Sequence, residues 1–181
     1  ISTIDHILTN SVERRSIADV PIGCFLSGGI DSSLVACLMH KLSNDKIKTF
    51  SIGFNEPKYN EADFAKRIAS HIGTDHHELY VSEKDAFDVI PKLPLMYDEP
   101  FADSSQIPTY LVSNLASKST TVSLTGDGAD EIFGGYGRYT FTDNIWTNMN
   151  FIDIFVRTKI GRLINTISPD KIRDFLNIFL S

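Results

Sequence analysis

Apolar runs and helix-like patterns alternate along the first two thirds of this chain. Short apolar runs at 22–26, 47–54 and 76–82 are typical of buried strands, and a fourth run at 120–128 leads into a glycine-rich turn. Between these runs, apolar positions recur every three or four residues, which predicts helices. The expected helices cover residues 1–17, 30–42, 60–73, 83–93 and 107–118.

This alternation predicts a fold class. Strands separated by helices form a mostly parallel sheet, because each parallel pair needs a crossover connection, and the helices cover both faces. We therefore expect a doubly wound α/β sheet of about five strands, with a helical C-terminal extension after about Phe141. In such a sheet, ligands bind beyond the carboxyl ends of the strands, near a switch in strand order. Two glycine-rich turns, SGGIDSS and TGDGADE, occupy strand ends of this kind.

Several residues indicate where helices begin and end. Asn60 is a possible N-cap and Gly73 a C-terminal stop for the helix between them. A short helix begins in ADEIFGGYGRY and is expected to break at Gly134 and Gly135. The chain starts and finishes inside helix-like patterns, so we expect it to be a piece of a longer protein.

Composition narrows the class of protein. A length of 181 residues suggests one domain, and a formal net charge of −6 argues against a nucleic-acid-binding surface. Cys24 and Cys37 lie in apolar surroundings and are interpreted as buried reduced thiols. No signal peptide or long apolar span is recognisable, which favours a cytoplasmic protein that does not bind membranes.

The segment SGGIDSS has the residue types of a phosphate-binding turn. Gly28 and Gly29 lack a Cβ, so the backbone can turn sharply and bring its N–H groups close to an anion. The next helix begins near Asp31, and its free N–H groups favour phosphate, while Ser27 and Ser32 add hydroxyl donors. The Walker lysine is absent, which argues against a kinase or GTPase. The alternative is a plain glycine turn in which Asp31 or Ser32 caps the helix.

The second turn is rich in carboxylates. LTGDGADEIFGGY adds Asp127, Asp130 and Glu131, three acidic residues within five positions. Such groups repel each other unless water or a shared cation separates them. Mg²⁺ prefers one or two carboxylates together with phosphate oxygens and water, so Asp31 and Asp130 are the predicted metal ligands. The alternative is a solvated acidic turn with a helix-capping aspartate.

Four motifs together resemble a known family. They are VPIGCFLSGGIDSS, FSIGF, YDEPFADSSQIPTY and LTGDGADEIFGGY. The first resembles the pyrophosphate-binding PP-loop of the N-type ATP pyrophosphatases. The four, in this order and spacing, resemble the synthetase domain of glutamine-hydrolysing asparagine synthetases. The resemblance covers roughly residues 1–140 and implies a fold like that of the adenine nucleotide alpha hydrolases.

The resemblance implies ATP-dependent amide synthesis with Mg²⁺. ATP would adenylate the β-carboxylate of aspartate with release of pyrophosphate, and ammonia would then attack the acyl-adenylate to give asparagine and AMP. A carboxylate is a poor acyl electrophile, and adenylation supplies it with a leaving group. Magnesium and helix N–H groups would offset the negative charge on the departing pyrophosphate.

The resemblance also implies roles for individual residues. Asp127 would face the reacting centre, and Asp127 and Glu131 are the catalytic candidates. Asp31 and Asp130 would hold Mg²⁺. The residues expected to bind ATP and its pyrophosphate are Leu26, Ser27, Gly28, Gly29, Asp31, Ser32, Ile52, Thr125 and Gly126.

Two features of the family are missing from this sequence. Nothing in it resembles the family's N-terminal glutaminase domain, so ammonia would come from that domain in the full-length chain, from a partner or from free ammonium. The family's catalytic lysine is expected beyond residue 181, since neither Lys159 nor Lys171 has a matching context. We therefore expect residues 1–181 to be a single synthetase domain that is incomplete by itself. Its expected partners are ATP, aspartate or a related acid, ammonia and the glutaminase domain.

Two other functions stay open. One is a different carboxylate-activating amide or lactam synthetase on the same scaffold, which the acid that drives pyrophosphate exchange would reveal. The other is a noncatalytic module that binds Mg·ATP and interacts with a partner. The carboxylates from Asp127 to Glu131 argue against this module, because a protein that only binds nucleotide needs fewer of them.

A few further polar residues invite a functional interpretation. His76 and His77 are adjacent on a strand and point to opposite faces, so we expect one packed and one exposed histidine rather than a metal site. Asp98, Glu99 and Asp103 either order a substrate amine or cap the helix that follows.

Overall fold

The structure is a computed structural model that describes residues 1–55, 60–100, 102–166 and 168 of the chain. Its internal contacts divide the chain into two compact units, one from Ile1 to Ala129 and one that begins at Asp130. The two units are described separately below.

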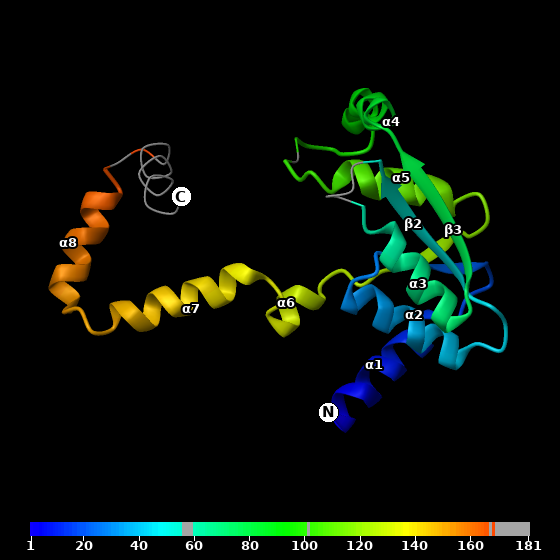
Figure 1. Cartoon of the computed structure of the whole chain (residues 1–181), viewed down its shortest axis with the longest axis horizontal. Coiled ribbons are helices and arrows are strands. Elements are labelled where there is room, and N and C mark those ends of the chain that lie inside the picture. Colours follow the sequence, from blue (N-terminus) through cyan, green and yellow to red (C-terminus); the bar gives the residue numbers. More distant parts are fainter. Residues whose placement is uncertain (56–59, 101, 167, 169–181) are drawn as a thin grey trace. The chain divides into compact units, whose positions relative to one another are not determined.

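The first unit is built on a parallel sheet (Figure 1). Its four strands lie in the order β3-β2-β1-β4, and all three pairings are parallel. Cys24 of β1 lies opposite Thr49 of β2 on one side and Leu124 of β4 on the other. The strands are β1 (Ile22–Phe25), β2 (Lys48–Phe54), β3 (Asp75–Val81) and β4 (Val122–Leu124).

The helices follow the predicted pattern with small changes at their ends. In the first unit they are α1 (Ser2–Arg15), α2 (Ile30–Leu42), α3 (Ala62–Ile72), α4 (Glu83–Val89), the 3₁₀ helix η1 (Ile90–Leu95) and α5 (Gln106–Ala116). The helix predicted over 83–93 is divided between α4 and η1, because Pro91 and Pro94 lack the N–H groups that an α-helix needs. Gly73 ends α3 as predicted, and the Asn60 side chain accepts a hydrogen bond from the Ala62 N–H.

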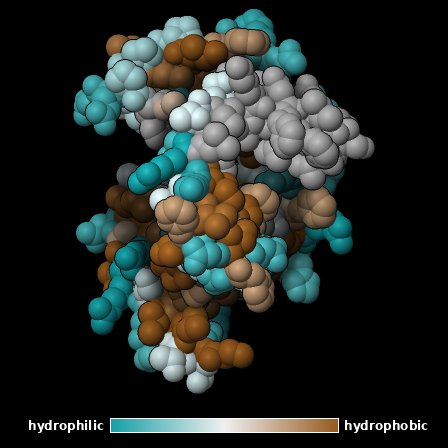
Figure 2. All heavy atoms as spheres, turned by 90° about the vertical axis from the view of Figure 1, so that its left-hand side faces the viewer, coloured by the Kyte–Doolittle hydropathy of each residue, from teal (hydrophilic) through white to brown (hydrophobic). Residues whose placement is uncertain are grey.

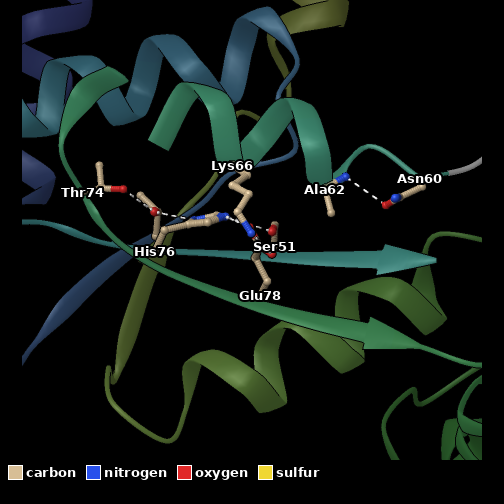
Figure 3. Close-up of polar contacts among 8 residues, drawn as sticks. Ser51, Asn60, Ala62, Lys66, Thr74, His76 and Glu78 are labelled. Atoms are coloured by element: carbon tan, nitrogen blue, oxygen red, sulfur yellow. Dashed lines mark hydrogen bonds and ion pairs between the residues drawn. The ribbon is translucent and has the colours of Figure 1, made fainter. Parts of the chain in front are cut away.

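Helices cover both faces of the sheet. In Figure 3, α3 lies above β2 and β3 and α5 lies below them. The doubly wound, parallel fold class is therefore confirmed. The described residues form four strands rather than about five, because the chain after β4 continues as helices.

The hydrophobic core lies between β1 and the helices α1, α2 and α3. Ala62, Ala65 and Ala69 of α3 are all nearly inaccessible to solvent, and their three- and four-residue spacing puts them on one face of the helix. Cys24 is buried in this core, and burial raises the pKa of its thiol to about 12. Cys37 is exposed, so the prediction that both thiols are buried is wrong for this residue. It lies between Ala36 and Leu38, which point into the core, and therefore faces outward.

The remaining elements after β4 are helical, as expected. They are α6 (Ala129–Phe133), α7 (Gly137–Met149) and α8 (Ile154–Ile164). The short α6 ends just before Gly134, where the sequence predicts a break. No helix in the described ranges is long and apolar enough to cross a membrane.

Some large apolar side chains lie at the surface. Ile1, Ile4 and Ile7 of α1 are exposed. Brown, hydrophobic atoms accordingly gather at the bottom of Figure 2, at the height of the first turns of α1.

Candidate functional site

The strand order switches between β1 and β4. After β1, the chain adds β2 and then β3 on one side, and β4 pairs with the opposite side of β1. At such a switch the connections leave neighbouring strands in opposite directions, which opens a crevice at their carboxyl ends. The SGGIDSS turn follows β1 and the TGDGADE turn follows β4. The first turn and residues 125–129 of the second turn, all in the first unit, therefore lie at the switch point.

The first turn is held together by its own hydroxyl groups. Ser27 Oγ lies 3.0 Å from Ser32 Oγ and accepts a 3.3 Å hydrogen bond from the Gly29 N–H. The Ser32 hydroxyl accepts from the Ser27 N–H and donates to the Gly29 carbonyl, and the Ser33 hydroxyl donates to that carbonyl as well. These contacts fix a tight turn in which Gly29 is the N-cap of α2.

This turn also rests against the beginning of α3. Gly28 has a φ of +88°, and a Cβ at this position would lie 2.8 Å from the backbone nitrogen of Ala65 and 2.8 Å from the Cβ of Phe64. Both the positive φ and the close approach require a glycine here. The first turn is thus packed between its own helix and α3, while the first-turn N–H groups of α2 remain directed at the switch point.

The second turn contacts the first through Gly126. A Cβ on Gly126 would lie 2.7 Å from the backbone nitrogen of Ser32 and 2.9 Å from the carbonyl carbon of Asp31. The backbone after β4 therefore lies directly against the first turn of α2. The two turns, almost a hundred residues apart in sequence, form one continuous surface.

The neighbours of Gly126 complete this surface. Thr125 donates its hydroxyl to Asp127 Oδ2 at 3.0 Å and accepts the Asp127 N–H at 3.3 Å, and the Asp127 side chain is exposed. Leu26 is 1% exposed, and its N–H donates to the Phe50 carbonyl. Ile52 is half-buried on β2, on the face that alternation assigns away from α3.

The last two acidic candidates, Asp130 and Glu131, belong to the second unit. Tyr136 donates its hydroxyl to Glu131 Oε1 at 2.6 Å. This hydrogen bond lowers the pKa of the Glu131 carboxyl and raises the pKa of the Tyr136 phenol to about 12. Asp31 lies in the first unit, so a Mg²⁺ ion shared by Asp31 and Asp130 stays a prediction.

The donor chemistry around the first turn suits Mg²⁺ held together with a nucleotide. Asp31 is half-buried beside Gly126 and offers carboxylate oxygens at the same edge as the α2 N–H groups. Mg²⁺ commonly takes one or two carboxylates and completes its shell with phosphate oxygens and water. No group of three or more His, Cys, Asp or Glu side chains in the described ranges could hold a metal by protein ligands alone.

The two adjacent histidines have separate structural surroundings, and Figure 3 shows those of His76. The His76 side chain is 10% exposed and the His77 side chain is 41% exposed, as the strand alternation predicts. His76 Nδ1 lies 2.8 Å from Thr49 Oγ1, and its Nε2 lies 3.2 Å from Ser51 Oγ and 3.4 Å from Glu78 Oε1. Burial lowers the pKa of His76, and the Glu78 carboxylate partly opposes this shift.

The acidic loop before α5 has a structural role at one position. Asp103 Oδ1 accepts the Ser105 N–H at 2.8 Å, and this bond lowers the pKa of the Asp103 carboxyl. The contact orders the turn that leads into α5, whose N-cap is Ser105, so Asp103 is not itself the helix cap. Asp98 and Glu99 are exposed.

Comparison with known proteins identifies the family of this chain. The profile of the family described as asparagine synthase matches residues 3–177. The chain belongs to the asparagine synthase family. It is 48% identical over 131 residues to the putative glutamine-hydrolysing asparagine synthetase 2 of Methanocaldococcus jannaschii, covering 72% of this chain and 25% of that protein.

Other asparagine synthetases are also similar in sequence to this chain. Asparagine synthetase 1 of Bacillus subtilis is 38% identical over 139 residues, and this region covers 77% of the chain and 22% of the relative. The asparagine synthetase of Gallus gallus is 35% identical over 147 residues, which covers 75% of the chain and 25% of the relative. The chain thus spans about a quarter of the length of these relatives.

Solved structures support the fold alone. An NH3-dependent NAD synthetase from Campylobacter jejuni, in complex with the nitrate ion, matches 97% of this chain and 92% of its own, with a TM-score of 0.52 and 14% sequence identity. An NMN synthetase from Francisella tularensis matches 72% of this chain and 56% of its own, with a TM-score of 0.51 and 15% identity. The family and these neighbours agree with the predicted PP-loop fold of the adenine nucleotide alpha hydrolases.

Sequence reasoning missed the contribution of α3 to the first turn. Phe64 and Ala65 lie against Gly28, although neither residue carries a functional motif. β2 also ends at the carboxyl edge of the parallel sheet, so the start of the helix that follows it, α3, could have been expected near the other strand-end turns. The position of this helix start after a parallel strand is the sequence signal that could have indicated the contact.

Proposed function

We propose that the full-length protein forms an amide from a carboxylic acid and ammonia with ATP, and that the acid is aspartate and the product asparagine. In the first step a carboxylate oxygen attacks the α-phosphorus of ATP and pyrophosphate leaves. In the second step ammonia attacks the acyl carbon, AMP leaves, and the nitrogen loses a proton. Ammonia would be supplied from glutamine by a glutaminase domain of the full-length protein.

The observation that carries this proposal is the close approach of Gly126 to the start of α2, where a Cβ on Gly126 would lie 2.7 Å from Ser32 N and 2.9 Å from Asp31 C. It supports the proposal because, within the first unit, the backbone next to Asp127 lies against the turn of N–H and hydroxyl donors at the start of α2. The N–H and hydroxyl donors suit the negatively charged pyrophosphate that departs. The carboxylates suit a bound cation and the reacting centre. The 35–48% identity to asparagine synthetases supports aspartate as the acid.

Each predicted residue has a task in this proposal. Ser27, Gly28, Gly29 and Ser32, with the α2 N–H groups, hold the pyrophosphate portion of ATP. Leu26, Ile52, Thr125 and Gly126 line the nucleotide, and Asp127 and Glu131 face the acyl group. Asp31 and Asp130 hold Mg²⁺, which supplies charge neutralisation on the phosphates when it is bound.

ATP–pyrophosphate exchange tests this function in the full-length protein. Exchange that depends on aspartate, within a panel of other carboxylic acids, is the expected result. Exchange with a different acid alone would replace aspartate and keep the chemistry, as in an amide or lactam synthetase. Binding of Mg·ATP without exchange for any acid would instead indicate a noncatalytic binding module.

The same assay tests the proposed magnesium ligands. Asp31→Asn and Asp130→Asn keep the side-chain size and remove one negative charge each, and each is expected to lower the exchange rate at least about a hundredfold. Asp19→Asn, at an exposed position outside both turns, is the matched control and should exchange normally. An unchanged rate in either test variant would remove that residue from the magnesium site.

A further inference from the structure

Both carboxylates of α6 contact the short segment that follows this helix. A Cβ on Gly135 would overlap Asp130 Oδ1 and lie 2.9 Å from Asp130 Cγ. The Asp130 carboxylate thus occupies the space that any other side chain at position 135 would take. The Gly135 N–H also donates to the Asp130 carbonyl at 3.0 Å, so the backbone of the segment is fixed at this point.

The next residue reaches the other carboxylate. The Tyr136 hydroxyl donates to Glu131 Oε1 at 2.6 Å. The Tyr136 ring contacts two neighbours, since the Arg138 guanidinium lies 4.1 Å from its centroid and the Tyr139 ring meets it edge-on at 5.7 Å. Contacts of this kind restrict an aromatic ring, so the hydroxyl that meets Glu131 is itself oriented.

We propose that Gly135 and Tyr136 are positioning residues, which set the directions of the Asp130 and Glu131 carboxylates respectively. Adjacent carboxylates repel each other and would otherwise turn apart into solvent. Gly135 leaves the space that the Asp130 carboxylate occupies, and the Tyr136 hydroxyl donates to the Glu131 carboxylate. Neither residue is charged, so both carboxylates are directed without loss of their negative charge. The inference rests on the proposed function, in which Asp130 binds Mg²⁺ and Glu131 faces the reacting centre.

A spectroscopic experiment tests the Tyr136 contact without any activity. The full-length protein carries tyrosine labelled with ¹³C at Cζ, and the Tyr136 signal is identified by its loss in Tyr136→Phe. We expect Glu131→Ala to shift the Tyr136 signal at neutral pH and to leave the Tyr139 signal in place. An unshifted Tyr136 signal would overturn the assignment of the contact.

Kinetics of aspartate-dependent exchange then test the positioning role of Tyr136. Tyr136→Phe keeps the ring and removes the hydroxyl, and it should lower kcat about tenfold while the KM for ATP stays constant. Tyr139→Phe is the matched control in the same ring stack and should behave as the wild type. Equal kinetics for the two variants would show that the hydroxyl positions nothing that matters to the reaction.

The Mg²⁺ dependence of exchange tests Gly135. Gly135→Ala mainly displaces the Asp130 carboxylate and asks only a small adjustment of the Asp130 Cα, 3.3 Å from the new Cβ, so the variant should fold and need about tenfold more Mg²⁺ for half-maximal exchange. Gly137→Ala is the control, since a Cβ there meets nothing within 4 Å. An unchanged Mg²⁺ requirement in Gly135→Ala would overturn its role. Failure of the wild type to exchange with any acid would reject the proposed function, while the tyrosine spectrum would still decide the Tyr136 contact.

Discussion

Gly28 and Gly128 adopt almost the same backbone conformation in two different turns. Their φ angles are +88° and +90°. A Cβ on Gly28 would run into the backbone of α3, whereas a Cβ on Gly128 would meet nothing within 4 Å. The first turn is therefore a packed part of the fold, and the second is an open loop that touches the fold through Gly126. The packed turn carries N–H and hydroxyl donors together with Asp31, whereas the open turn carries Asp127 on an exposed loop, so the predicted binding groups lie in regions that are packed to different extents.

Replacing the two glycines by alanine should give the largest contrast. Gly28→Ala combines an unfavourable φ with displacement of α3 and is expected to lower the free energy of unfolding by about 3 kcal/mol. Gly128→Ala has only the conformational cost, about 1 kcal/mol. Urea unfolding of the full-length protein measures both values. Equal losses would contradict the distinction between a packed and an open turn.

A substitution at the point where the turns meet should act on binding more than on stability. Gly126→Ala would push its Cβ against backbone atoms of Ser32 and Asp31 and separate the turns. Misplacement on the order of 1 Å can cost about a hundredfold, so we expect a comparable loss of Mg·ATP affinity in calorimetric titration. Gly161→Ala in α8, with no atom within 4 Å of its Cβ, serves as the control. Wild-type affinity in Gly126→Ala would disprove a shared nucleotide surface.

The hydroxyl network within the first turn should make a smaller contribution. Ser27→Ala loses the contacts with Ser32 Oγ and the Gly29 N–H, each worth about 1 kcal/mol at most. We expect about a tenfold weaker affinity for Mg·ATP. Ser33→Ala removes a hydroxyl that donates to the Gly29 carbonyl but does not bridge to Ser27, and it should weaken binding less. The reverse order of effects would reject this account of the turn.

The smallest effect is expected from acidification around His76. Its folded pKa lies below the ordinary value of 6.5, so the unfolded chain takes up a proton first as the pH falls. The contribution of neutral His76 to the free energy of unfolding is therefore fully present above about pH 6.5, and it is lost as the pH falls toward the folded pKa. Urea unfolding between pH 5.5 and 7.5, a range set around about pH 6.5, should show this slope, and His76→Gln should reduce it.

His40→Gln provides the comparison for that measurement, because His40 lies exposed near the end of α2. It should keep the wild-type slope. Since α3 pairs with β3 through Lys66 and Glu78, next to His76, and also supports Gly28, acid should disturb the first turn before the second. Hydrogen exchange of the two turns at low pH would detect the order, and earlier loss of protection in the second turn would count against it.

The sequence was sufficient for the order of elements and for the two turns. Short apolar runs between helical patterns located the four strands of the described residues, and the residue types at positions 27–33 and 125–131 indicated donors and carboxylates. It was insufficient for long-range contacts. α3 lies against Gly28 and the Asp130 carboxylate lies against Gly135, in the space where a Cβ would be. The sequence shows that a glycine lacks a side chain, but it does not show which atom fills the space beside it. Cys37 was misjudged because apolar neighbours in sequence do not define the inward face of a helix.

The pairing of β1 with β4 has a consequence for synthesis of the chain. Ile22 is in register with Val122, so this ladder closes across 100 residues (122 − 22). Pairings between such distant segments form late, because the intervening loop must first be ordered. A ribosome-bound chain that stops short of β4 has the first turn but lacks the second, acidic turn. We therefore expect it not to bind Mg·ATP until β4 has emerged.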